Sequence, residues 1–172
     1  MTLTRLVGAA AALSLAAGAA LAEDIALSVP LISTVPDTYS AGFSLTHLMA
    51  GLFTDTITFS PTVTGTVSTG VFTFGFTPAT DINFTSAMLN GQPLTLTGAG
   101  TLESGLLSPV NVSGPFVLTV SGFAGVGLAD DAAISASYSG VVNVTAVPEP
   151  GTLALLLAGV AAVGFVARRR GG

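Results

Sequence analysis

Apolar and polar residues alternate along most of the middle of the chain. Nine short segments between residues 25 and 147 place Thr or Ser at every second position, between Val, Ile, Leu or Phe, as in LFTDTITFS at 52–60. This two-residue period is typical of half-buried β-strands. No helical pattern separates the segments, although parallel crossovers would need one. We therefore predict an all-β fold, an antiparallel β-sandwich or jelly roll.

Two segments allow finer predictions. In VFTFGFT at 71–77 the three phenylalanines share one side of the strand, the apolar side, while two threonines and Gly75 take the other. Asn90-Gly91 is predicted to form a two-residue hairpin loop, because both residues tolerate the positive φ angles of such turns. Pro93 follows at once, so the second strand of this hairpin is expected to start late or to lie at a sheet edge.

The first 22 residues have the pattern of a secretory signal peptide. One arginine, Arg5, precedes an Ala- and Leu-rich run that ends in Ala20-Leu21-Ala22. This order predicts a signal helix over residues 1–22, with cleavage before Glu23. A permanent membrane helix is the alternative, but the acidic residues that follow directly favour cleavage. The exported domain is then expected to span residues 23–146.

The charge of this domain excludes one class of partner. It contains no Lys and no Arg, but it holds every acidic residue of the chain except Glu149, which gives a formal charge of −8. Nucleic acid is excluded because phosphate contacts need basic side chains. Only His47 or the new amino terminus could form an ion pair with a side chain of the domain. Since the chain has no Cys, disulfides cannot support the fold.

Asp55 is the most unusual polar residue of the predicted strands. By alternation it shares a face with Phe53, Ile57 and Phe59, and no basic residue of the domain is available to neutralise it. A buried carboxylate must be hydrogen-bonded, solvated or bound to a cation. We favour a structural role with hydrogen bonds from the protein. A calcium site shared with Asp81 or with the Asp130-Asp131 pair is the alternative, although no ligand-loop spacing supports it.

The remaining candidates for chemistry have simpler interpretations. His47 is the only histidine, and no nucleophile motif accompanies it, so catalysis is not expected. Asp130-Asp131 is interpreted as a turn before the last strand. GFAGVG at 122–127 lacks the lysine and the helix of a phosphate-binding loop, so it is predicted to be a bend. We predict a chain without enzymatic activity and without a cofactor.

The segment 151–167 has no charged residue and is followed by Arg168, Arg169 and Arg170. As a helix its 17 residues would extend over about 25 Å, just enough for a thin bilayer. The arginines would stop the chain on the cytoplasmic side of the membrane. We therefore predict a single transmembrane helix here, with the domain outside.

Residues 147–172 resemble a known sorting signal. Pro148-Glu149-Pro150, an apolar span and a terminal Arg cluster together look like the PEP-CTERM signal of Gram-negative bacteria, which a membrane protease-transpeptidase called exosortase reads. The resemblance implies that these three residues are recognition residues and that the tail is cleaved nearby. It also implies a destination at the cell surface or outside the cell, often in species that produce exopolysaccharide and form biofilms.

A second resemblance concerns the domain itself. FTDTITF at 53–59 is similar to the FxDxF motif of one PEP-CTERM subfamily, with Phe53 and Asp55 in place and Ile57 instead of the second Phe. Leu89-Asn90-Gly91 and Tyr138-Ser139-Gly140 also fit that subfamily.

From these features we expect a non-enzymatic secreted protein of the cell surface, extracellular matrix or biofilm. The alternative is a β-sandwich module that binds carbohydrate or calcium, and a hydrolase is the third class.

Overall fold

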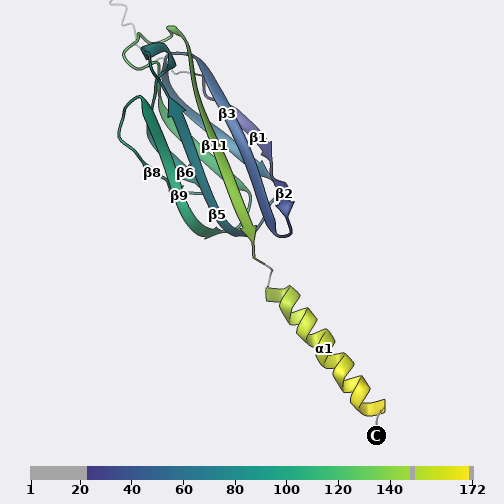
Figure 1. Cartoon of the computed structure of the whole chain (residues 1–172). Helices are drawn as coiled ribbons and strands as arrows, with labels where there is room; N and C mark the ends of the chain where they lie inside the picture. Colours follow the sequence, from purple (N-terminus) through teal and green to yellow (C-terminus); the bar gives the residue numbers. More distant parts are fainter. Residues whose placement is uncertain (1–22, 148–149, 171–172) are drawn as a thin grey trace, which may run out of the picture.

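The computed structural model describes residues 23–147 and 150–170, and it is a β-sandwich followed by one helix (Figure 1). One sheet has five strands in the order β1-β4-β10-β6-β7, and the other has six in the order β2-β3-β11-β5-β9-β8. The predicted all-β class is confirmed. The predicted signal helix at 1–22 lies outside the described residues.

The strands of the five-stranded sheet are β1 (Ala26–Pro30), β4 (Gly51–Ser60), β10 (Phe116–Ala124), β6 (Ile82–Leu89) and β7 (Gln92–Pro93). Those of the six-stranded sheet are β2 (Ile32–Val35), β3 (Thr38–Met49), β11 (Ala133–Ala146), β5 (Gly65–Phe74), β9 (Leu102–Val112) and β8 (Thr95–Leu96). A short 3₁₀ turn, η1 (Pro78–Thr80), connects β5 to β6, and α1 (Pro150–Arg170) follows β11.

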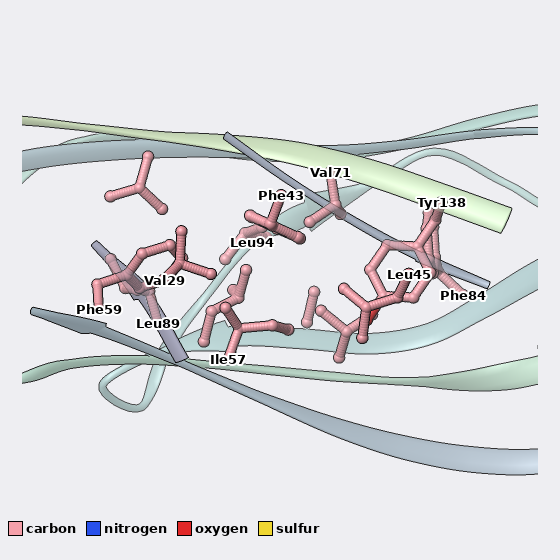
Figure 2. Packing of buried hydrophobic residues seen from close by; sticks show 14 of the residues in the cluster. Val29, Phe43, Leu45, Ile57, Phe59, Val71, Phe84, Leu89, Leu94 and Tyr138 are labelled. Carbon is pink, nitrogen blue, oxygen red and sulfur yellow. The ribbon is translucent and has the colours of Figure 1, made fainter. Parts of the chain in front are cut away.

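The alternation predicted for 52–60 fixes which side of β4 is buried. Phe53, Asp55, Ile57 and Phe59 point inward, while the threonines between them are exposed or half-buried. Figure 2 shows the layer of side chains that fills the space between the sheets. This hydrophobic core contains side chains from both sheets, among them Ile57 of β4, Phe43 of β3 and Tyr138 of β11. Burial of this apolar surface is the main stabilising term of the fold.

The prediction of a purely antiparallel sandwich is wrong at one edge. Strand β1 pairs with β4 in parallel, from Ala26 opposite Thr56 to Pro30 opposite Ser60. Between these two strands the chain passes through β2 and β3 of the other sheet. Because no tight hairpin joins β1 to β4, nothing forces their directions to oppose each other.

The turn predictions at Asn90-Gly91 and Asp130-Asp131 are confirmed, whereas GFAGVG at 122–127 is a bend only from Gly125 on, because its first three residues end strand β10. Asn90 and Gly91 have φ angles of 47° and 78° and connect β6 to β7. Strand β7, which contains Pro93, is a two-residue strand at the edge of its sheet. Asp131 also has a positive φ, 62°, in the turn that precedes β11.

The orientation of β5 differs from the expected one. Phe72 and Phe74 do share a side, but that side faces solvent, and Thr73 between them is buried. Thr73 lies opposite Tyr138 in the neighbouring strand, and its hydroxyl donates to the carbonyl of Ser137 at 2.9 Å. Since the ring of Tyr138 already fills the core at this level, the inward position has room for a threonine rather than for a phenylalanine.

Helix α1 covers the segment 151–167 that we predicted to be helical, and its described side chains are exposed. Within the described residues, no helix is long and apolar enough to cross a membrane. The helical part of the prediction is therefore confirmed, whereas the transmembrane part is not.

Candidate functional site

The most distinctive group of polar side chains lies between the two sheets. Asp55 is fully buried on β4, and its carboxylate accepts three hydrogen bonds. The backbone N–H of Ile25 donates to Oδ1 at 2.8 Å, whereas the Nε2 of His47 and the hydroxyl of Tyr138 lie 3.0 Å and 2.7 Å from Oδ2. Of the interpretations left open for Asp55, the structure selects hydrogen bonding by the protein. We call Asp55, His47 and Tyr138 the Asp55 cluster.

Strand alternation explains how three distant parts of the chain reach one point. His47 follows Phe43 and Leu45 on the inward side of β3, and Tyr138 is on the inward side of β11. The two strands are neighbours in the six-stranded sheet, with Ala136 opposite His47, and Asp55 faces them from the other sheet. The cluster therefore links the two sheets by hydrogen bonds inside the apolar core.

Aromatic rings surround the Asp55 cluster. The ring of His47 lies 4.1 Å from that of Phe53, measured between centroids, and both are within 17° of parallel to the ring of Tyr138. Phe84 meets Tyr138 edge-to-face at 5.6 Å. Such arrangements stabilise a core beyond the area that they bury. They also leave no opening to solvent, because His47, Asp55 and Tyr138 are all 1% exposed or less.

Burial determines the electrostatics of the cluster. Loss of solvation, and then the negative charge of Asp55 and the hydrogen bond to it, raise the pKa of Tyr138 far above its ordinary value. The hydroxyl therefore stays protonated and serves as a permanent donor. The His47–Asp55 contact is the one ion-pair geometry between side chains that the described residues show, and it uses the only histidine of the chain. The Nδ1 atom of His47 is buried and has no partner among the described residues.

The structure does not bring together the carboxylates considered for calcium. Both oxygens of Asp55 already accept hydrogen bonds from the protein. Asp81 directly precedes β6, which β10 separates from β4 in the sheet. Burial raises the pKa of Asp81, and a hydrogen bond from the backbone of Ile82 lowers it by less. Asp130 and Asp131 lie in the loop before β11. In the described part of the chain, no three His, Cys, Asp or Glu side chains are grouped so that they could hold a metal ion.

Sequence reasoning missed a second buried carboxylate, Glu103. It is 1% exposed on β9, and it accepts hydrogen bonds from the backbone N–H groups of Phe84 at 2.8 Å and Gly100 at 3.0 Å. Its side chain thus ties the β8–β9 loop to β6 of the other sheet. Strand alternation could have predicted its burial, because Glu103 lies between Leu102 and Ser104, which point outward.

The C-terminal segment contains the remaining predicted site residues. Pro150 begins α1, while Pro148 and Glu149 lie outside the described residues. Arg168 and Arg169 are exposed in the last turn of the helix, and the guanidinium of Arg169 lies 5.6 Å from the ring centroid of Phe165. Arg170 ends the helix.

Comparison with protein families identifies this segment. Residues 146–170 match the model of the PEP-CTERM protein-sorting motif, which overlaps almost entirely the segment 147–172 predicted from the sequence. No curated protein matches the chain. The match implies that exosortase sorts the protein to the cell surface or beyond it. Membership of the FxDxF subfamily is not confirmed.

Proposed function

We propose that this chain is a non-enzymatic component of the extracellular matrix or biofilm, delivered there by exosortase. The observation that carries the proposal is the sorting motif at 146–170, placed directly after the last strand of a sandwich. The absence of enzymatic activity is part of the proposal. It is supported by the complete burial of His47 and Asp55, since the histidine cannot reach a substrate without opening of the core.

The proposal includes an intermediate that the membrane holds while exosortase acts. Its support is the composition of α1, which exposes Leu155, Leu157 and Val163 among other apolar side chains. A helix that is apolar on all sides is better accommodated by lipid or by another protein than by water. In this intermediate Arg168, Arg169 and Arg170 remain on the cytoplasmic side. The signal peptide at 1–22, which the structure does not describe, starts the export.

We also propose membership of the FxDxF subfamily. The contacts of the motif residues support this proposal, because the Asp55 carboxylate is hydrogen-bonded to His47 in the core and Phe53 packs on the ring of His47. Tyr138, from the third segment of the resemblance, donates to the same carboxylate.

The test measures the intact mass of the protein in a host that encodes exosortase and in the same host without it. We expect the exosortase-positive host to remove residues near and beyond Glu149, whereas the other host retains them. Glu149→Ala should prevent the cleavage, while Glu23→Ala, which removes the same charge from the other end of the domain, should not. Retention of residues 151–172 in all these strains would contradict sorting by exosortase.

A separate measurement addresses the location. Antibody labelling of unpermeabilised cells should detect the domain at the surface, or the culture medium should contain it. If all of the protein stays inside the cell, the proposed matrix role is wrong.

A further inference from the structure

The outer face of the six-stranded sheet carries no charged side chain among the described residues. Its outward positions on β3, β11, β5 and β9 are hydroxyl, amide, glycine or apolar residues without charge, and Glu103 of β9 points into the core. Asp55 is buried on β4 of the other sheet. The remaining acidic residues of the domain lie in its N-terminal segment, at turns and at the start of β6: Glu23, Asp24, Asp37, Asp81, Asp130 and Asp131. An acidic domain thus presents a broad neutral surface.

The strand register arranges this surface in rows across the sheet. One row joins Ser44, Ser139, Phe72 and Ser104 on four neighbouring strands. The hydroxyl of Ser139 donates to that of Ser44 at 3.1 Å. Hydroxyl groups on β11 and β9, those of Ser139 and Ser104, therefore flank an aromatic ring on β5.

The next rows form a shallow groove beside Phe72. It is lined on one side by Phe72 and Leu106, which are 38% and 52% exposed, and on the other by Ser68, Ser108 and Asn143. Gly70 lies between them. A Cβ atom there would be 3.1 Å from the ring of Phe72 and 3.0 Å from Leu106, so the missing side chain lets both lie close over the strand.

Polar groups of the groove are suited to neutral partners. The amide oxygen of Asn143 accepts a hydrogen bond from the Ser40 hydroxyl at 3.0 Å, and the amide NH₂ group still offers donors. The hydroxyls of Ser68 and Ser108 each offer a donor and acceptors. An aromatic ring with neutral hydrogen-bonding groups beside it matches a sugar, which has apolar C–H faces and a rim of hydroxyls.

Charge and polarity indicate which kind of partner can bind to this outer face. Acidic polymers and anionic lipid surfaces would find no cation in the sandwich, because the domain has no Lys and no Arg. A second copy of the chain would bury the hydroxyl rows against an identical face, and buried polar groups cost free energy unless they are paired. A hydroxylated neutral chain meets neither obstacle.

We propose that this groove, with Phe72 and Asn143 as its main contacts, binds a neutral polysaccharide. The inference rests on the proposed extracellular location for its biological setting and names the partner that would hold the protein in a matrix. Binding does not require exosortase, so it can fail or succeed independently of the sorting experiment.

The test uses affinity electrophoresis of the full-length chain in a sugar-free detergent, through gels that contain cellulose derivatives, amylose, dextran or, as an acidic comparison, alginate. We expect at least one neutral polymer to retard the protein and alginate to have no effect. Phe72→Ala and Asn143→Ala should each weaken the retardation by about tenfold. Phe72→Tyr, which keeps a ring, should retain it. Leu52→Ala, which removes an exposed apolar side chain from the other sheet, is the matched control and should change nothing.

Two outcomes would overturn the proposal. One is that no neutral polymer in the panel retards the protein, or that Phe72→Ala is retarded as strongly as the unaltered chain while its melting curve shows that it is folded. The other is that sedimentation shows self-association which Phe72→Ala abolishes, since the face would then belong to a second copy. If Phe72→Ala does not fold, Asn143→Ala and Phe72→Tyr decide by the same comparison.

Discussion

Replacing Asp55 by Asn tests whether the Asp55 cluster holds the sandwich together. The substitution keeps the shape of the side chain but exchanges one acceptor oxygen for an NH₂ group. If the remaining oxygen accepts from His47 and Tyr138, the NH₂ group faces the N–H of Ile25, which now lies 2.8 Å from Oδ1. At least one donor is then left without an acceptor, whichever way the amide turns.

The cost follows from these contacts. A buried donor without a partner costs about 1–3 kcal/mol, and the loss of the negative charge weakens the other two hydrogen bonds by about 1 kcal/mol each. Removal of a buried charge also relieves its desolvation penalty, which offsets part of the sum. We expect a net loss of about 2–4 kcal/mol from the free energy of unfolding, a large part of the stability of a domain of this size.

Urea unfolding followed by far-UV circular dichroism measures this loss. With a slope of about 2 kcal/mol per molar urea, the midpoint should fall by about 1–2 M without a change of slope. Asp37→Asn is the matched control, because Asp37 is exposed in a turn with φ of 63°, a conformation that Asn adopts as readily as Asp. It should stay within about 0.5 kcal/mol of the unaltered chain. If Asp55→Asn unfolds at the same urea concentration as Asp37→Asn, the reasoning about the cluster is refuted.

Three further predictions use the same unfolding assay. Above pH 10, the ordinary pKa of tyrosine, the unfolded chain loses the Tyr138 proton that the folded chain keeps, so the free energy of unfolding should fall by about 1.4 kcal/mol per pH unit. Tyr138→Phe should remove this part of the pH dependence. If the variant keeps the same alkaline slope, the prediction is wrong. Glu103→Gln should lower the free energy of unfolding by about 1–3 kcal/mol, because one of two backbone N–H groups loses its acceptor. A loss near zero would contradict this role of the carboxylate and mean that water takes its place. Gly140→Ala should lower the free energy of unfolding by about 2 kcal/mol, because its Cβ would overlap the ring of Phe43. The control Gly42→Ala, whose Cβ would be 3.9 Å from its nearest neighbour, should not destabilise the chain. Equal effects of the two substitutions would rule out the steric explanation.

Strand alternation made much of the fold predictable. On β4 every second residue points inward, and this alone places Asp55 in the core. The same rule puts His47 inward on β3 and Tyr138 inward on β11, so the members of the cluster could be identified as core residues from the sequence. Their convergence could not, because it depends on which strands are neighbours and on how the two sheets face each other.

The failure at β5 has a different origin. Both sides of this strand carry apolar residues, with Val67 and Val71 on one side and Phe72 and Phe74 on the other. Periodicity cannot choose between two apolar sides; the volume already occupied by Tyr138 in the core makes the choice. The same choice places an aromatic ring on a neutral outer face, a feature that the pattern of the sequence did not suggest.

The hydrogen bonds of Asp55 join the residue before the first strand, and the last strand, to the middle of the domain. Ile25 lies 30 residues before Asp55, and Tyr138 lies 83 residues after it, in the strand that ends at Ala146. The sorting motif begins at that same residue. In the proposed export from the N-terminus, a chain that crosses unfolded would bring Asp55 across the membrane before Tyr138, its last donor. The core would then be completed only when the sorting motif itself reaches the membrane. On this proposal, completion of folding and presentation of the motif would be coincident steps.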